Sequence, residues 1–119
     1  MLKYSPKVLN EVFGALADPT RRGILERLAK SDHCVTDLAK PYAMSLPAVS
    51  QHLRVLENAG LIQRRRRGRV HQLRLETARL RQAEAWIEAH RRAWEERLDR
   101  LDEYLKELQS KEKKHEPKE

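Results

Sequence analysis

Residues 44–70 read MSLPAVSQHLRVLENAGLIQRRRRGRV, an amphipathic stretch that runs directly into the densest positive charge of the chain. Its apolar residues recur at helical spacing, with Val49, Leu53 and Leu56 on one face. Gly60 follows this stretch, and glycine readily adopts the left-handed conformation that closes many helices. The stretch therefore predicts an amphipathic helix that ends just before an arginine-rich segment.

The expected helix spans residues 45–59. Ser45 suits its N-cap, and Pro47 is tolerated in the first turn because the amide hydrogen that proline lacks has no partner there. A shorter helix is expected over 36–41, with Thr36 as its N-cap. Two helices joined by a turn of a few residues predict a helix-turn-helix.

The segment after this helix-turn-helix has the pattern of a β-hairpin. We expect one strand over 61–66 and a second over 70–75, with Gly68 supplying the positive φ of the tight turn. A hairpin in this place predicts a winged helix. Side chains alternate along a strand, so neighbouring arginines point to opposite faces. The arms and tip of the hairpin carry Arg64, Arg65, Arg66, Arg67 and Arg69.

Two further helices are expected before this motif, over 7–17 and 19–30. Asp18 suits the N-cap of the second, and Pro19 suits its first position. With the hairpin, these helices predict a mainly α winged helix-turn-helix core over residues 1–76.

Residues 77–109 contain neither proline nor glycine and predict one long helix. Its apolar stripe is longer than so small a core can cover, so we expect the stripe to mediate dimerisation within the same domain. Residues 110–119 are charged without apolar periodicity and are expected to be disordered. The stripe is formed by Leu80, Ile87, Trp94, Leu98, Leu101 and Leu105.

The positive charge is concentrated in the N-terminal part of the chain. Residues 1–75 hold 14 Lys/Arg against 6 Asp/Glu, whereas residues 76–119 hold 11 against 12. This asymmetry predicts a polyanionic partner, most often nucleic acid. The lone Cys34 fits a reducing compartment, and the sequence has neither a leader nor an 18-residue apolar run. We therefore expect a cytoplasmic protein that does not contact a membrane.

In a helix-turn-helix the second helix enters the major groove of double-stranded DNA with its N-terminal residues leading. Glutamine pairs with adenine, arginine with guanine, and alanine can contact a thymine methyl group. The wing arginines can contact the backbone or enter the minor groove. Besides the five wing arginines, the expected DNA-binding residues are Ser45, Pro47, Ala48, Ser50, Gln51, His52, Arg54, Arg21 and Arg22.

The runs LADPTRRGILERLA and PAVSQHLRVLENAGLI, followed by the basic hairpin, resemble the ArsR/SmtB family of bacterial winged-helix repressors over residues 8–108. The resemblance implies a homodimer that binds an imperfect palindrome over its own or a neighbouring promoter. It further implies release of the DNA by an inducer. The family places dimer contacts on its first and last helices, which adds Val8 and Val12 to the expected interface.

Many members of that family sense metals, but two of their site types are incomplete here. A Cys-Val-Cys-Asp-Leu motif would align with residues 34–38, where Thr36 replaces the second cysteine. One thiolate is a poor site for a thiophilic ion. On the last helix His90 lacks the paired Asp-x-His and His-x-x-Glu spacings. We therefore expect no metal site and no cofactor.

Two readings of other residues stay open. Cys34 lies before a helix start, where a redox role needs a lowered thiol pKa, and an inert half-buried thiol is the alternative. Trp86 and Trp94 lie on one helical face and predict either dimer core or a pocket for an apolar effector. We expect His33 to lie in a loop and His71 to pack in a strand.

The sequence as a whole predicts a dimeric, sequence-specific transcriptional repressor that does not respond to metal. It has no paired carboxylates, nucleophile set or glycine-rich phosphate loop, so we do not expect an enzyme. The alternatives are a protein-interaction module that uses the long helix, a redox repressor that uses Cys34, and a metal-responsive repressor. An unknown small-molecule inducer is a candidate partner.

Overall fold

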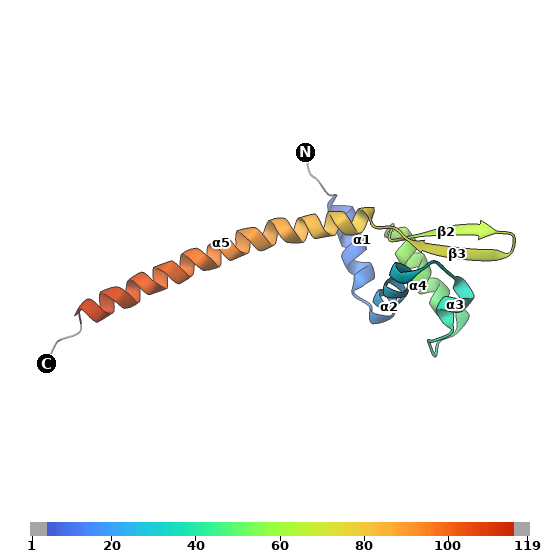
Figure 1. Cartoon of the computed structure of the whole chain (residues 1–119), viewed down its shortest axis with the longest axis horizontal. Helices are drawn as coiled ribbons and strands as arrows, with labels where there is room; N and C mark the ends of the chain where they lie inside the picture. The colour runs from blue at the N-terminus through green and yellow to red at the C-terminus, as the bar shows by residue number, and fades with distance from the viewer. Residues whose placement is uncertain (1–4, 116–119) are drawn as a thin grey trace. The chain divides into compact units, whose positions relative to one another are not determined.

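The computed structural model describes residues 5–115, with side chains through residue 112. The chain forms two compact units that divide between Ala85 and Trp86, and each unit is described by itself. In chain order the elements are α1 (Pro6–Leu16), α2 (Pro19–Lys30), β1 (His33–Cys34), α3 (Val35–Ala39), α4 (Leu46–Asn58), β2 (Ile62–Arg67), β3 (Val70–Leu75) and α5 (Ala78–His115) (Figure 1).

Helices α1 and α2 meet at Asp18. Its carboxylate accepts a hydrogen bond from the backbone N–H of Arg21 at 3.0 Å, and Pro19 occupies the first helical position. The predicted cap and helix start are confirmed. The apolar stripe of α1 turns Val12 and Ala15 inward, and both are almost fully buried.

Helix α4 is the amphipathic helix predicted over 45–59. Ser45 caps it by accepting from the N–H of Ala48 at 3.3 Å. Gly60 closes it with φ of +72°, and the N–H groups of Gly60 and Leu61 bond the carbonyls of Glu57 and Leu56. These two bonds form a Schellman motif, which explains why the chain turns sharply toward β2 at this glycine.

Helix α3 differs from its predicted bounds. It starts at Val35, with Cys34 at the N-cap position, so Thr36 lies inside the helix and does not cap it. The Thr36 hydroxyl instead lies 3.3 Å from the Cys34 sulfur. Arg27 of α2 donates to the carbonyls of Asp37 and Leu38 at 2.9 Å each, which satisfies the end of this short helix.

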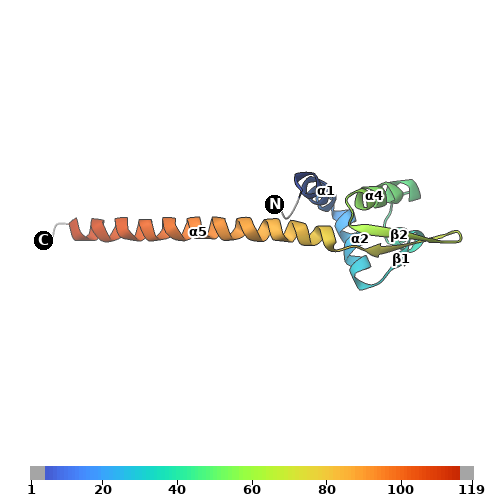
Figure 2. The same ribbon diagram turned by 90° about the horizontal axis from the view of Figure 1, so that it is seen from above.

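The sheet is larger than the predicted two-stranded wing. The hairpin of β2 and β3 forms with Gly68 at φ of +62°, as expected, but β1 adds a third antiparallel strand in the order β1–β3–β2. His33 pairs with Leu73, so the prediction that His33 lies in a loop is wrong. A segment of two residues is too short to show the alternation of apolar and polar side chains that marks a strand. It is a strand only because it pairs with β3, which is distant in the sequence. The hairpin turn extends past the helices of this unit in two perpendicular views (Figures 1 and 2).

The core of the first unit lies between the helices and one face of the sheet. Ile24 of α2, Leu53 of α4 and Leu73 of β3 are fully buried, and Leu38 of α3 joins them. No polar side chain is buried among the residues that the structure describes. Helix α4 and the hairpin of β2 and β3 are therefore fixed to one apolar core.

Helix α5 runs without interruption from Ala78 to His115. Residues 110–115, expected to be disordered, continue the helix, because their lysines and glutamates favour helix and no glycine or proline interrupts them. Residues 116–119 of the predicted tail lie outside the described residues. Within residues 5–115, no helix has the length and apolarity that a membrane span requires.

Candidate nucleic-acid interface

Helix α4 separates an apolar face from a polar one. Val49, Leu53 and Leu56 are fully buried, as predicted. The opposite face offers Gln51 and Arg54, both exposed and without a hydrogen bond or ion pair to another described residue. Among the other predicted contact residues, Ser45 and Pro47 are exposed, while Ala48, Ser50 and His52 are half-buried.

The first turn of α4 offers fewer free donors than a helix start usually does. Pro47 has no N–H, and the N–H of Ala48 is used by the Ser45 hydroxyl. The N–H of Leu46 is left to contact an anion. The Leu46 side chain is 52% exposed beside the polar face, and Met44 before it is 41% exposed. Sequence reasoning missed both, although a leucine outside the inward stripe is a usable signal.

Arg21 is committed to other residues of its own chain. Its Nε and Nη2 donate to the carbonyls of Ala15 and Gly14 at 2.8 and 3.0 Å. Its Nη1 lies 3.3 Å from Nδ1 of His52. The end of α1 carries carbonyls without helical partners, and a guanidinium is well suited to them. The predicted contact of Arg21 with DNA phosphates stays a prediction.

Arg22 also donates to the C-terminal end of α1, but through one nitrogen only. Its Nη1 bonds the carbonyl of Leu16 at 2.7 Å, and the residue is exposed. Asp18 lies at the centre of this junction, 3.9 Å from Nδ1 of His52. The backbone N–H of Arg21, and then the nearby His52 and Arg21 side chains, lower the pKa of the Asp18 carboxyl.

The five wing arginines fall into two groups by strand register. Arg64 pairs with Leu73 and Arg66 with His71, so both share the face on which Leu73 is buried. Arg64 donates from Nε to Glu57 of α4 at 3.0 Å, and Arg66 donates from Nε to the Gly68 carbonyl at 3.0 Å. Arg64 therefore braces the wing against α4.

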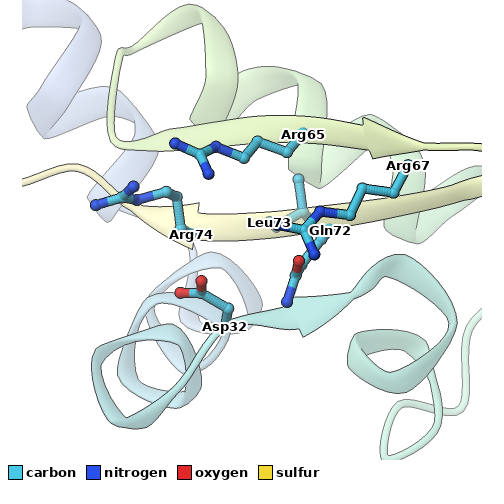
Figure 3. A pocket seen from close by; sticks show the side chains of 6 residues that line it. All are labelled: Asp32, Arg65, Arg67, Gln72, Leu73 and Arg74. Carbon is cyan, nitrogen blue, oxygen red and sulfur yellow. The ribbon is translucent and has the colours of Figure 1, made fainter.

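Arg65 and Arg67 lie on the opposite face of the sheet. Both line a hollow of about 210 Å³ together with Asp32, Gln72, Leu73 and Arg74 (Figure 3). Arg69 lies in the turn beside Gly68 and is exposed. Arg65, Arg67 and Arg69 have no ion-pair partner among the described side chains. Arg74 was not among the predicted DNA-binding residues.

Cys34 and His90 both make contacts within the chain. The thiol of Cys34, followed by Lys40, lowers the pKa of Asp37. His90 donates from Nδ1 to the Trp86 carbonyl at 2.8 Å, and the two rings stack with centroids 4.2 Å apart. Across residues 5–115, no group of three His, Cys, Asp or Glu side chains is arranged to hold a metal ion.

The residues expected at a dimer interface differ in exposure. Val12 is fully buried in the core of its own chain, so it has no surface to offer a partner, and Val8 is half-buried. Leu80 lines a shallow apolar hollow with Leu16, Leu25 and Leu75. The remaining predicted side chains are exposed on α5, namely Ile87, Trp94, Leu98, Leu101 and Leu105.

Comparisons with known proteins identify similar sequences and similar folds. The sequence profile of the family described as bacterial regulatory protein, arsR family, matches residues 18–64. The transcriptional repressor SdpR of Bacillus subtilis is 37% identical over 79 residues, which cover 66% of this chain and 88% of SdpR.

Two further relatives extend the comparison. The HTH-type transcriptional regulator Rv2034 of Mycobacterium tuberculosis is 54% identical over 61 residues, which cover 50% of this chain and 57% of Rv2034. The crystal structure of the ArsR family transcriptional regulator RHA00566 superimposes with a TM-score of 0.75 at 41% identity. That match covers 80% of this chain and 97% of RHA00566. The winged helix-turn-helix fold predicted from the sequence is confirmed.

Proposed function

Since the chain belongs to the arsR family of bacterial transcriptional regulators, we propose that it represses transcription as a homodimer bound to an imperfect palindrome. Its relatives are DNA-binding regulators and not enzymes. The proposed target is its own promoter or a neighbouring one. The observation that carries the proposal is the outward face of α4, which is polar, unpartnered and fixed from behind by three fully buried residues.

In the proposed complex α4 lies in the major groove. Gln51 and Arg54 are the proposed base readers, because their side chains offer bidentate hydrogen bonds to adenine and guanine. The Ser45 end of the helix lies over a phosphate. Leu46 joins this surface as an apolar contact for a thymine methyl group. Ala48, Ser50 and His52 are half-buried and are the remaining proposed DNA contacts of α4.

The proposed role of the wing is electrostatic. Arg69 and the unpaired Arg65 and Arg67 supply phosphate or minor-groove contacts, and Arg22 adds one from α2. Arg64 and Arg66 contribute mainly by holding the wing, since their donors bond Glu57 and the Gly68 carbonyl. Binding by such a surface falls steeply with salt because each phosphate contact releases counterions.

The proposed dimer uses the exposed stripe of α5. Its large apolar side chains are between 42% and 63% exposed, from Leu108 to Leu98, on a helix that is otherwise charged. A contiguous apolar surface of this kind indicates a protein interface. A two-fold dimer presents two α4 helices to half-sites about 34–36 Å apart or a multiple of that distance.

We propose that the repressor does not respond to metal. Thr36 stands where a second thiolate would be needed, and its hydroxyl lies 3.3 Å from the Cys34 sulfur. His90 is held by the carbonyl and ring of Trp86. The proposed inducer is therefore a small molecule, and the redox role of Cys34 is the alternative that a thiol-specific oxidant would test.

The proposal is tested by fluorescence anisotropy with a labelled DNA fragment from immediately upstream of the gene, with scrambled DNA of equal length as control. We expect tight binding to the upstream fragment only, a steep fall of log K with log salt, and no change on adding zinc or EDTA. Flat salt dependence on both DNAs would contradict the proposal and favour a protein-interaction module. A response to zinc would contradict its metal-independent part.

A further inference from the structure

The open face of the sheet carries a cluster of positive side chains. In the register of β2 and β3, Gln63 pairs with Arg74 and Arg65 pairs with Gln72. Directly paired residues share one face, so Arg65, Arg67, Gln72 and Arg74 lie on the face opposite the buried Leu73 side chain. On this face Arg65, Arg67 and Arg74 are exposed and Gln72 is half-buried.

These side chains surround a hollow of about 210 Å³. Figure 3 shows the guanidinium groups of Arg65, Arg67 and Arg74 and the amide of Gln72 along it, with the carboxylate of Asp32 at one side. Asp32 precedes β1, the strand that the sequence did not predict, so the third strand completes the hollow. The size is suitable for a group such as phosphate with its first waters.

The charges of this hollow are unbalanced. Three arginines and one aspartate line it, and none of the three arginines forms an ion pair with a described residue. Arg64 and Arg66 on the other face, by contrast, bond Glu57 and a backbone carbonyl. Like charges that lie close together repel one another unless a counter-charge offsets them. Guanidinium groups bind the oxygens of phosphate in bidentate geometry, and the Gln72 amide is a further donor.

We propose that this hollow is a phosphate-binding site formed by Arg65, Arg67 and Arg74 with Gln72. The site assigns a role to Arg74 and Gln72, which the proposed DNA interface leaves unused. A bound free phosphate group occupies Arg65 and Arg67 and removes them from the DNA-binding surface. The effect on DNA binding rests on the proposed function. The phosphate site itself rests only on the geometry of the sheet.

The direct test uses the full-length protein with ¹⁵N-labelled arginine side chains. Inorganic phosphate or pyrophosphate is titrated against chloride at constant ionic strength, and the Nε–H signals are followed by NMR. We expect saturable shifts confined to the three arginines of the hollow. Equal, unsaturable shifts of every exposed arginine would overturn the site, because they would report general screening only.

Three variants sharpen this titration. We expect Arg74→Gln to weaken phosphate binding about tenfold, by loss of one charge-assisted bidentate contact. Asp32→Asn should tighten it, because the variant removes the one carboxylate at the hollow. Arg100→Gln removes the same charge from the exposed surface of α5 and should leave it unchanged. Equal effects of Arg74→Gln and Arg100→Gln would overturn the proposal.

A second arm identifies the source of the phosphate. If the hollow takes a backbone phosphate of bound DNA, Arg74→Gln lowers the slope of log K against log salt by about one. If it takes a free phosphorylated molecule, that slope stays unchanged while the NMR titration still saturates. Loss of both effects would overturn the site. The NMR titration needs no DNA, so its failure and a failure of the proposed repressor function are distinguishable.

Discussion

The guanidinium of Arg21 lies 3.3 Å from Nδ1 of His52 and thereby joins the start of α2 to the middle of α4. The same side chain donates to two carbonyls at the end of α1. Its backbone N–H is bound by Asp18, whose carboxylate lies 3.9 Å from His52. Three helices therefore meet at Asp18, Arg21 and His52, and this junction orients the helix proposed to read DNA.

Asp18 makes the junction sensitive to acid. The backbone N–H of Arg21 lowers the pKa of Asp18 below the ordinary aspartate value of about 4. A folded pKa below the unfolded one contributes stability that is complete above the unfolded value and is lost as pH falls through the folded value. We expect Asp18→Asn, which retains a capping oxygen without the charge, to unfold at lower urea than the wild type at pH 7.

The difference between the two proteins should shrink as the pH falls below about 4, because the wild-type carboxylate is then neutralised as well. Urea midpoints measured between pH 7 and pH 2 check this. Asp99→Asn, on the exposed surface of α5, is the matched control. A difference between Asp18→Asn and the wild type that stays constant over this range would contradict the electrostatic role.

Gly60 provides a second structural prediction. It sits at φ of +72°, and an added Cβ would lie 2.6 Å from Cδ of Arg79, the residue that pairs with Glu11 at 3.3 Å. We expect Gly60→Ala to lower the free energy of unfolding by roughly 1–2 kcal/mol, from the left-handed conformation alone. Displacement of Arg79 adds to that loss.

Gly14→Ala is the matched control for Gly60→Ala. Gly14 lies inside α1 and its added Cβ would meet nothing within 4 Å. Alanine is the better helix former, so this variant should gain up to about 1 kcal/mol. Chemical unfolding of both variants measures these changes, and a Gly60→Ala variant as stable as the wild type would show that the closure of α4 does not depend on glycine.

The sequence predicted the elements whose pattern is local. Helix α4 shows its buried stripe, its cap and its closing glycine within one stretch, and the hairpin shows its turn residue. Strand β1 was missed because His33 and Cys34 become a strand only by pairing with Leu73 and Gln72. Residues 110–115 were expected to be disordered from their charge, although lysine and glutamate also favour helix.

Some residues of the candidate site could likewise be predicted from a local pattern, and others could not. The outward face of α4 follows from helical periodicity, so Gln51 and Arg54 were found where the structure has them. The use of each arginine does not follow from periodicity, because it depends on which carbonyl or carboxylate lies nearby in the fold. Arg21 and Arg64 are held within the chain, whereas Arg69 is free of ion pairs among the described residues.

Gln51 is expected to discriminate between DNA sequences. It is exposed on α4 and contacts no other side chain through a hydrogen bond among the described residues, so its removal should leave the fold intact. We expect Gln51→Ala to weaken binding to the cognate fragment by roughly 1–3 kcal/mol and binding to scrambled DNA much less. Anisotropy titrations on both DNAs measure the ratio, and equal losses would refute a base-reading role.

The two kinds of wing arginine should respond differently to the same substitution. Arg69→Gln removes an exposed, unpaired charge and should lower the slope of log K against log salt by about one, without changing stability. Arg64→Gln removes the partner of Glu57 and should destabilise the packing of the wing on α4. Salt titrations and urea melts of both variants check this contrast. Identical behaviour in both assays would mean that strand register does not decide the role of a wing arginine.

Trp94 is expected to hold two subunits together. It is 54% exposed in the single chain, and its ring lies edge-on to Trp86 with centroids 6.5 Å apart, so Trp86 supports it from within its own helix. Large aromatic side chains at the centre of an interface commonly contribute about 2 kcal/mol or more. We expect Trp94→Ala to weaken the dimer by at least about tenfold. Sedimentation equilibrium measures the dissociation constant, with Glu96→Ala as a control on the same helix. A dimer as tight as that of the control would place the interface elsewhere and leave the stripe of α5 to another protein partner.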